Sequence, residues 1–124
     1  MIYHLRQLPD PSLSPNKRLH FYKLASAKRE AKDYMIALVK EQGSPASPFD
    51  KSHITITWVS KDKRRRDIDN LFASMKAYID GLVVAGVLVD DSAGHASYTL
   101  RYEIGVAYDT VIEVSPLEQL EGRI

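Results

Sequence analysis

The hydrophobic periodicity of the chain changes abruptly between residues 59 and 68. Residues 53–59 alternate, with Ile54, Ile56 and Trp58 on one face, which is typical of a strand that buries one face. Residues 68–85 instead place apolar side chains at steps of three and four, which is typical of an amphipathic helix. Its apolar stripe comprises Ile68, Leu71, Phe72, Met75, Ile79, Leu82 and Val83. The fold must therefore accommodate a strand that is followed closely by a helix.

Residues 22–42 predict another helix, because apolar residues again recur at helical steps and Gly43 follows as a stop signal. Residues 1–7 alternate weakly and could form a strand. Residues 97–114 are rich in Tyr, Thr, Val and Ile, and we interpret them as two strands that could pair as a hairpin. The remaining segments are a proline-rich loop over 8–19, a turn-rich connector over 43–50 and a short extended run over 87–89.

The order of these elements, β-α-β-α-β-β, predicts an α+β fold with a mixed sheet of about four strands and two main helices. The 124 residues fit one small domain, which we place over residues 1–124. A domain of this size buries only about two-thirds of its unfolded surface, so a homodimer would add stability.

Composition excludes several classes of protein. There is no cysteine, which rules out disulfides, thiolate zinc sites and a cysteine nucleophile, and which suits a reducing cytoplasm. The start MIYHLRQLPD carries no long apolar stretch, so we expect no signal peptide, and no window is apolar enough for a membrane span. The net charge is only +1, with 17 basic and 16 acidic residues, but the charges are clustered.

Four features that could take part in binding or catalysis fall within residues 61–92. A run in which five of six residues are basic ends at Arg66, and the pair Asp67 and Asp69 follows it directly. The amphipathic helix comes next, and the pair Asp90-Asp91 lies just past it. At about 100° per residue, Lys76 lies on the same edge of that helix as Asp69.

This combination suits the hydrolysis of a phosphodiester bond. Mg²⁺ prefers oxygen ligands, usually one or two carboxylates with waters and phosphate oxygens. A bound Mg²⁺ can orient a water, lower the pKa of that water and neutralise charge on the phosphate. Clustered carboxylates repel DNA, and neighbouring Arg and Lys side chains can offset this repulsion by contacting phosphates.

Each feature also has a purely structural interpretation. Asp67 and Asp69 could cap a helix, and Asp90-Asp91 could belong to an ordinary turn. The basic run could be a solvated surface, and Lys76 a surface lysine. The histidines have no partner at metal-binding spacing, so we interpret them as structural or surface residues. The close grouping of the four features favours a functional site.

RRRDIDN followed by KAYIDGLVVAGVLVDDS resembles the signature of the RusA-type Holliday junction resolvases, which are crossover junction endodeoxyribonucleases. Their pattern is a basic run, D-[LI]-D-N-L, a helix with K-A-x-x-D-x-L, and then A-G-x-x-x-D-D. The upstream segment LSPNKRLHFYKLASAKREAKDY is similar, more loosely, to the S-P-N loop and basic helix of phage-encoded members. Together these segments cover most of the chain.

The resemblance implies a homodimer that binds four-way DNA junctions and cuts two strands symmetrically with Mg²⁺, for which we expect Mn²⁺ to substitute. Asp67, Asp69 and Asp91 correspond to its metal-binding and catalytic aspartates, Asp90 is an auxiliary ligand, and Lys76 corresponds to its catalytic lysine. The residues that we expect to bind DNA phosphates are Lys63, Arg64, Arg65, Arg66, Lys17 and Arg18.

One departure from the family pattern affects Lys76. Shorter family members have about three fewer residues between D-N-L and K-A, which is nearly one helical turn. Here Phe72-Ala73-Ser74 corresponds to the insertion. The extra residues either move Lys76 along the helix axis or are absorbed as a bulge or a loosened turn.

Our leading hypothesis is therefore a metal-dependent, structure-selective endodeoxyribonuclease of DNA recombination and repair. The alternative is a protein that binds branched DNA without cutting it. A nucleotide-sugar transferase with an Asp-x-Asp metal site is disfavoured, because the chain has no room for a nucleotide-binding domain.

Overall fold

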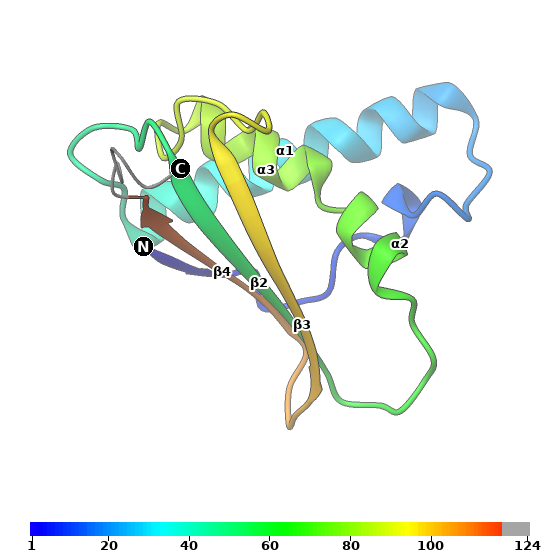
Figure 1. The fold of residues 1–124 in the computed structure, drawn as a ribbon. Coiled ribbons are helices and arrows are strands. Elements are labelled where there is room, and N and C mark those ends of the chain that lie inside the picture. The colour runs from blue at the N-terminus through cyan, green and yellow to red at the C-terminus, as the bar shows by residue number, and fades with distance from the viewer. Residues whose placement is uncertain (118–124) are drawn as a thin grey trace.

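The computed structural model describes residues 1–117, which form a four-stranded mixed sheet and its helices (Figure 1). The strands are β1 (Ile2–His4), β2 (Ser52–Ser60), β3 (Ala96–Ile104) and β4 (Asp109–Pro116). The helices are the 3₁₀ helix η1 (Pro11–Leu13), α1 (Phe21–Gln42), α2 (Ile68–Ala73) and α3 (Lys76–Val84). The α+β class and the mixed sheet are as predicted. Residues 118–124 of the predicted domain lie outside the described residues.

Strand β2 lies inside the sheet, whose order is β1-β4-β2-β3. It pairs in parallel with β3 and antiparallel with β4, nearly along its whole length. Ile54, Ile56 and Trp58 are fully buried and share one core with α1 and α3, as the alternation predicted. The two long helices therefore cover the apolar face of this strand.

The predicted hairpin over residues 97–114 is wrong. Strands β3 and β4 do form there, but β2 lies between them and they do not pair with each other. Parallel strands need a long crossover, and the segment that contains α2 and α3 provides it between β2 and β3. The chain then turns past the end of β2, where the Gly105 N–H donates to the Ser60 carbonyl oxygen at 2.8 Å.

Helix α1 begins and ends within one residue of the prediction. Gly43 ends it with a φ of +106°, a left-handed conformation that favours glycine, and its N–H donates to the Val39 carbonyl oxygen at 2.8 Å. Its buried side chains recur at helical steps, as predicted, and are Ala27, Ala31, Met35, Leu38 and Val39. No helix within residues 1–117 has the length and apolar character needed to cross a membrane.

The single helix predicted over residues 68–85 is wrong, because it breaks at Ser74-Met75 into α2 and α3. The Ser74 hydroxyl donates to the Asn70 carbonyl oxygen at 2.9 Å, a contact that bends helices, and the Met75 N–H bonds three residues back to Phe72. Met75 is fully buried, whereas Ile68 is 42% exposed. Of the predicted stripe, Met75, Ile79 and Leu82 are buried, whereas Leu71, Phe72 and Val83 are half-buried.

The segment that leads to Asp90 is tied to the connector between α1 and β2. Phe49 forms an isolated parallel bridge with Leu88, through hydrogen bonds to Val87 and Val89. Val87 and Leu88 are buried, so the predicted extended run is anchored in the core. This anchor positions the two aspartates that follow it.

Helices α1 and α3 pack closely at Gly81. A Cβ atom at this position would lie 2.7 Å from Met35 Cβ and 2.8 Å from the Lys32 carbonyl oxygen. Both distances are shorter than van der Waals contact, and neither neighbour is the flexible end of a side chain. The absence of a side chain at Gly81 therefore allows the helices to approach this closely.

We predict that Gly81→Ala lowers the free energy of unfolding by about 1–3 kcal/mol, although alanine is the better helix former. The cause is the forced separation of α1 and α3. Urea denaturation measures the change, and Gly94→Ala is the matched control, because a Cβ there meets nothing within 4 Å. Equal stability of the two variants would contradict this account of the packing.

Candidate functional site

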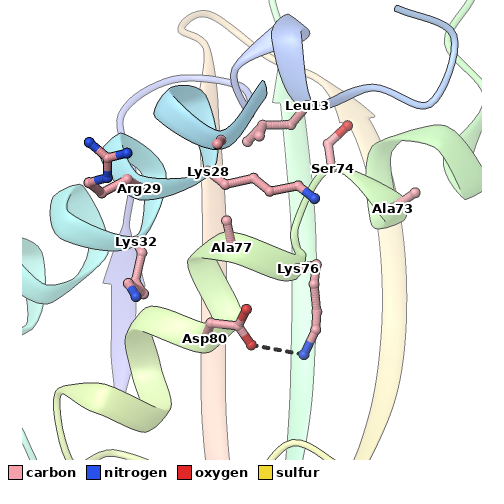
Figure 2. Close-up of a pocket in the computed structure, with 10 residues that line it drawn as sticks. Leu13, Lys28, Arg29, Lys32, Ala73, Ser74, Lys76, Ala77 and Asp80 are labelled. Carbon is pink, nitrogen blue, oxygen red and sulfur yellow. Dashed lines mark hydrogen bonds and ion pairs between the residues drawn. The ribbon is translucent and has the colours of Figure 1, made fainter. Parts of the chain in front are cut away.

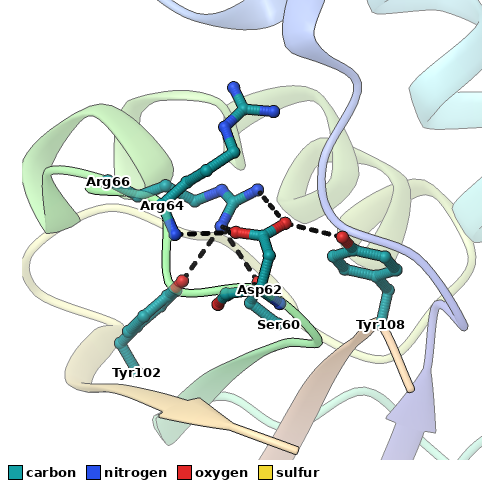
Figure 3. A network of polar contacts seen from close by, with 6 residues as sticks. All are labelled: Ser60, Asp62, Arg64, Arg66, Tyr102 and Tyr108. Carbon is teal, nitrogen blue, oxygen red and sulfur yellow. Dashed lines mark hydrogen bonds and ion pairs between the residues drawn. The ribbon is translucent and has the colours of Figure 1, made fainter. Parts of the chain in front are cut away.

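The basic loop, residues 61–67, leaves the end of β2 and is held by a network around Asp62 (Figure 3). The Asp62 carboxylate accepts hydrogen bonds from Arg66 Nη1 at 2.8 Å and Nη2 at 3.1 Å. It also accepts from the Tyr108 hydroxyl at 2.6 Å and from the Arg64 backbone N–H at 2.9 Å. These bonds fix the path of the basic loop at the point where it leaves the sheet.

Arg66 belongs to the structure of this loop. Its Nη1 also donates to Ser60 Oγ at 2.9 Å and to the Tyr102 hydroxyl at 3.1 Å. Only 17% of its side chain is exposed, against 89% for Arg65. The predicted phosphate-binding residues of the loop therefore differ in their surroundings, because Arg66 is engaged within the protein whereas Lys63, Arg64 and Arg65 are exposed.

The Asp62–Arg66 pair is charged at neutral pH. Hydrogen bonds from the Arg66 guanidinium, the Tyr108 hydroxyl and the Arg64 N–H hold the pKa of Asp62 well below its usual range. The hydrogen bond to Asp62 raises the pKa of Arg66 in turn. The geometry is bidentate, which fixes the orientation of the guanidinium more firmly than a single contact.

Asp67 lies at the N-cap position of α2, but its side chain makes no capping hydrogen bond. Its carboxylate lies 3.3 Å from Arg65 Nε, and its side chain is half exposed. The Asp69 carboxylate is exposed and accepts from the N–H of Asn70 at 3.0 Å. Helix capping therefore does not account for Asp67, and both carboxylates face solvent.

Lys76 begins α3 and contacts two carboxylates. Its Nζ donates to Asp91 Oδ2 at 2.6 Å and to Asp80 Oδ1 at 2.8 Å. The hydrogen bonds to Asp80 and Asp91 raise the pKa of Lys76 well above its usual value. Lys76 is therefore positively charged at neutral pH and can stabilise negative charge, but it cannot accept a proton there.

The turn after α3 orients the second acidic pair. The Asp91 N–H donates to Asp90 Oδ1 at 2.8 Å, and the pKa of Asp90 is lowered first by a hydrogen bond from Ser92 and then by this one. The side chain of Asp91 is 19% exposed, so Asp91 is the more enclosed of the pair. Asp91 also lines a hollow of about 410 Å³ with Phe72 and Tyr98.

The structure brings Lys76 and Asp91 together but does not gather all the predicted aspartates. Within residues 1–117, no three acidic or histidine side chains lie close enough to hold one metal ion. Asp67 instead lines a different hollow of about 380 Å³, together with Arg64 and Arg65. Helix α2 supplies residues to both hollows and therefore forms a wall between them.

The other predicted cations, Lys17 and Arg18, are exposed on the loop before α1. Their neighbour Asn16 lines the hollow that contains Arg64 and Arg65. The loop before α1 and the basic loop thus border one concave surface, although they are far apart in the sequence.

Sequence reasoning did not identify the roles of Asp62, Asp80, Tyr102 and Tyr108. The first two have a local signal, since Asp62–Arg66 and Lys76–Asp80 are opposite charges four residues apart. The tyrosines have no local signal, because Tyr108 is 46 residues from Asp62 and Tyr102 is 36 residues from Arg66 in the sequence.

Comparison of the sequence with models of known protein families finds no match. Comparison with curated proteins finds none either.

We predict that Arg66→Gln lowers the free energy of unfolding by about 1–3 kcal/mol, because it removes hydrogen bonds to a charged carboxylate. Arg65→Gln is the matched control and should change stability by less than about 0.5 kcal/mol, because its side chain is exposed. Urea denaturation of both variants measures the difference. Similar losses in both would show that Arg66 has no special structural role.

We also predict that the stabilising effect of Asp62 disappears in acid. Its folded pKa lies below the unfolded value of about 3.9, so the stabilisation is present above that pH and is lost as the pH falls further. The difference in unfolding free energy between the native protein and Asp62→Asn should therefore shrink below about pH 4. Denaturation across this range measures it, with the exposed Asp33→Asn as control. A difference independent of pH would contradict the assignment.

Proposed function

We propose that this protein is a Mg²⁺-dependent endonuclease that resolves four-way (Holliday) DNA junctions by paired symmetric nicks, in DNA recombination and repair. The proposal follows the resemblance to the RusA-type resolvases, including phage-encoded members. It implies a cytoplasmic protein that acts on branched DNA as a homodimer.

The contact between Lys76 and Asp91 carries the proposal. The resemblance selects both as site residues, although they are 15 residues apart in the sequence. Their side-chain atoms lie 2.6 Å apart. A lysine and an aspartate that meet beside a hollow, on the same side of α3 as Asp80, provide charges of both signs where a phosphate could be held.

The donor chemistry of the acidic residues fits Mg²⁺. All of them offer carboxylate oxygens, and Mg²⁺ in proteins commonly takes only one or two carboxylates and completes its shell with water and substrate phosphate. In this proposal Asp67, Asp69 and Asp91 would hold the ion with help from Asp90, and Mn²⁺ would substitute for it. Because Asp67 and Asp91 line different hollows in the free protein, binding of the ion would have to draw them together. When bound, the ion would lower the pKa of a water and neutralise charge on the phosphate.

Lys76 acts by its charge. Its raised pKa keeps it protonated at neutral pH, and 68% of its side chain is exposed. It can therefore exchange a carboxylate for a phosphate oxygen and stabilise the negative charge that grows there during hydrolysis. Its two aspartate partners hold the ammonium group in position before substrate arrives.

The exposed cations bind the phosphate backbone in this proposal. Lys63, Arg64 and Arg65 project from a loop whose path Arg66 fixes, and Lys17 and Arg18 lie on the neighbouring loop. Arg66 therefore acts chiefly as a positioning residue. Phosphate contacts of this kind supply affinity and orientation without sequence preference.

A homodimer suits the two-fold symmetry of a four-way junction. Paired cuts need two catalytic sites, and two copies related by a two-fold axis supply them. Each protomer would then cut one of two equivalent strands.

A second candidate function is the binding of branched DNA without cleavage. The observation that favours it is the separation of Asp67 from Asp91, which line different hollows. One experiment distinguishes the two functions.

We predict that the native protein nicks an end-labelled mobile four-way junction in paired symmetric positions with Mg²⁺ and not with EDTA, and leaves a linear duplex intact. Asp69→Asn should slow cutting by about 100-fold or more, because bound metal contributes several kcal/mol of charge stabilisation. It should keep or tighten junction binding, because it removes a negative charge beside phosphate.

Glu113→Gln is the matched control, because it makes the same carboxylate-to-amide change at an exposed position of β4. Junction binding without cutting by the native protein would favour the second candidate. Loss of junction binding in Asp69→Asn alone would contradict the placing of Asp69 beside phosphate.

A further inference from the structure

A basic hollow of about 500 Å³ lies between α1 and α3, and Lys76 is one of its lining residues (Figure 2). Its charged lining residues are Lys28, Arg29, Lys32, Lys76 and Asp80. Figure 2 shows the Lys28 side chain reaching from α1 toward α3. Alanines from α1, α2 and α3 also line the hollow, and their small side chains leave it open.

The charge of this hollow is strongly positive. Its one lining carboxylate, Asp80, is already paired with Lys76 at 2.8 Å. Within residues 1–117, the side chains of Lys28, Arg29 and Lys32 make no ion pair. Like charges four residues apart, such as Lys28 and Lys32, destabilise a helix. Folding therefore gives no reason for this cluster, whereas an anionic partner does.

The hollow is continuous with the two surfaces described above. It shares Ala73 and Lys76 with the hollow that contains Asp91, and it shares Ser74 with the hollow that contains Arg64 and Asp67. The break between α2 and α3 is thus the place where the three meet. A polyanion bound at Lys76 would therefore extend into the basic hollow.

We propose that the hollow between α1 and α3 binds the phosphate backbone of a DNA strand next to the phosphate held at Lys76. This inference rests on the proposed function, because it takes the ligand to be DNA. Lys28 and Lys32 lie about 6 Å apart along the helix axis and can contact different phosphates of one strand. An anionic membrane surface fits less well, because membrane-binding helices place large apolar side chains beside their cations, and Leu13 is the one large apolar residue that lines the hollow. The exposed Phe21 and Tyr22 lie at the start of α1, outside that lining.

The test replaces the three α1 cations together, as Lys28→Gln/Arg29→Gln/Lys32→Gln. Fluorescence anisotropy measures binding to a labelled four-way junction and to a linear duplex over a range of salt concentrations, in Ca²⁺ or EDTA to prevent cutting. Three lost phosphate contacts should reduce the slope of log affinity against log salt by about 2–3. Affinity at low salt should fall by at least about tenfold.

The matched control removes the same charge from exposed positions elsewhere, as Lys40→Gln/Lys51→Gln/Arg101→Gln. It should change the slope by less than about one. The unfolding midpoint of neither triple variant should fall below that of the native protein, which separates lost binding from lost folding. Because the replaced residues are exposed or half-buried, no loss of stability is expected.

The outcomes separate this inference from the proposed function. Equal slopes and affinities for the α1 variant and the native protein would overturn the inference, even if the native protein cuts junctions. DNA binding that depends on the α1 cations, in a native protein that never cuts, would support the inference and refute the nuclease. A native protein that binds phosphatidylserine vesicles and no DNA would overturn both.

Discussion

Most of the architecture depends on β2, a strand that is paired on both sides and buried on one face. Because this apolar face must be covered, α1 and α3 lie together over it, and Gly81 allows them to approach. Because β2 ends at Ser60, the basic loop and α2 emerge from one end of the sheet. The candidate site residues of the basic loop and α2 therefore lie on segments outside the core, and the ends of these segments are attached to the core.

Charged residues close together in the sequence have different roles here. Arg66 is fixed by Asp62, Ser60 and Tyr102, whereas Arg65 is open to solvent beside it. Lys76 is held by two aspartates, while Lys28, Arg29 and Lys32 in the same hollow have no such partners within residues 1–117. The net charge of +1 conceals this separation, since acids and bases gather in different places. The local distribution of charge, and not its total, determines which surfaces can attract a polyanion.

Local sequence predicts what local interactions determine. The alternation in β2 and the helical stripe in α1 each reflect one buried face, so both elements lie where they were predicted. The strand order was not predicted, because it depends on pairing between distant segments. The break at Ser74 lies at the Phe72-Ala73-Ser74 insertion, where a bulge or loosened turn was one of two alternatives, and the Ser74 hydroxyl contact accompanies it. At the candidate site, Lys76 and Asp91 are in contact, whereas the roles that the resemblance gives them stay predictions. The role of Arg66 was missed because Tyr102 and Tyr108 come from far along the chain.

Helix α2 contains no buried residue, and it joins the Arg66 network on one side to the buried Met75 on the other. Its main apolar contacts are those of the half-buried Leu71 and Phe72, the latter packed edge-on against Tyr98. A segment with so little enclosed surface has low local stability, so it can be displaced while the core remains intact. A ligand can therefore reposition α2, and with it Asp67 and Asp69, at small free-energy cost. Binding of that ligand could bring together aspartates that are apart in the free protein.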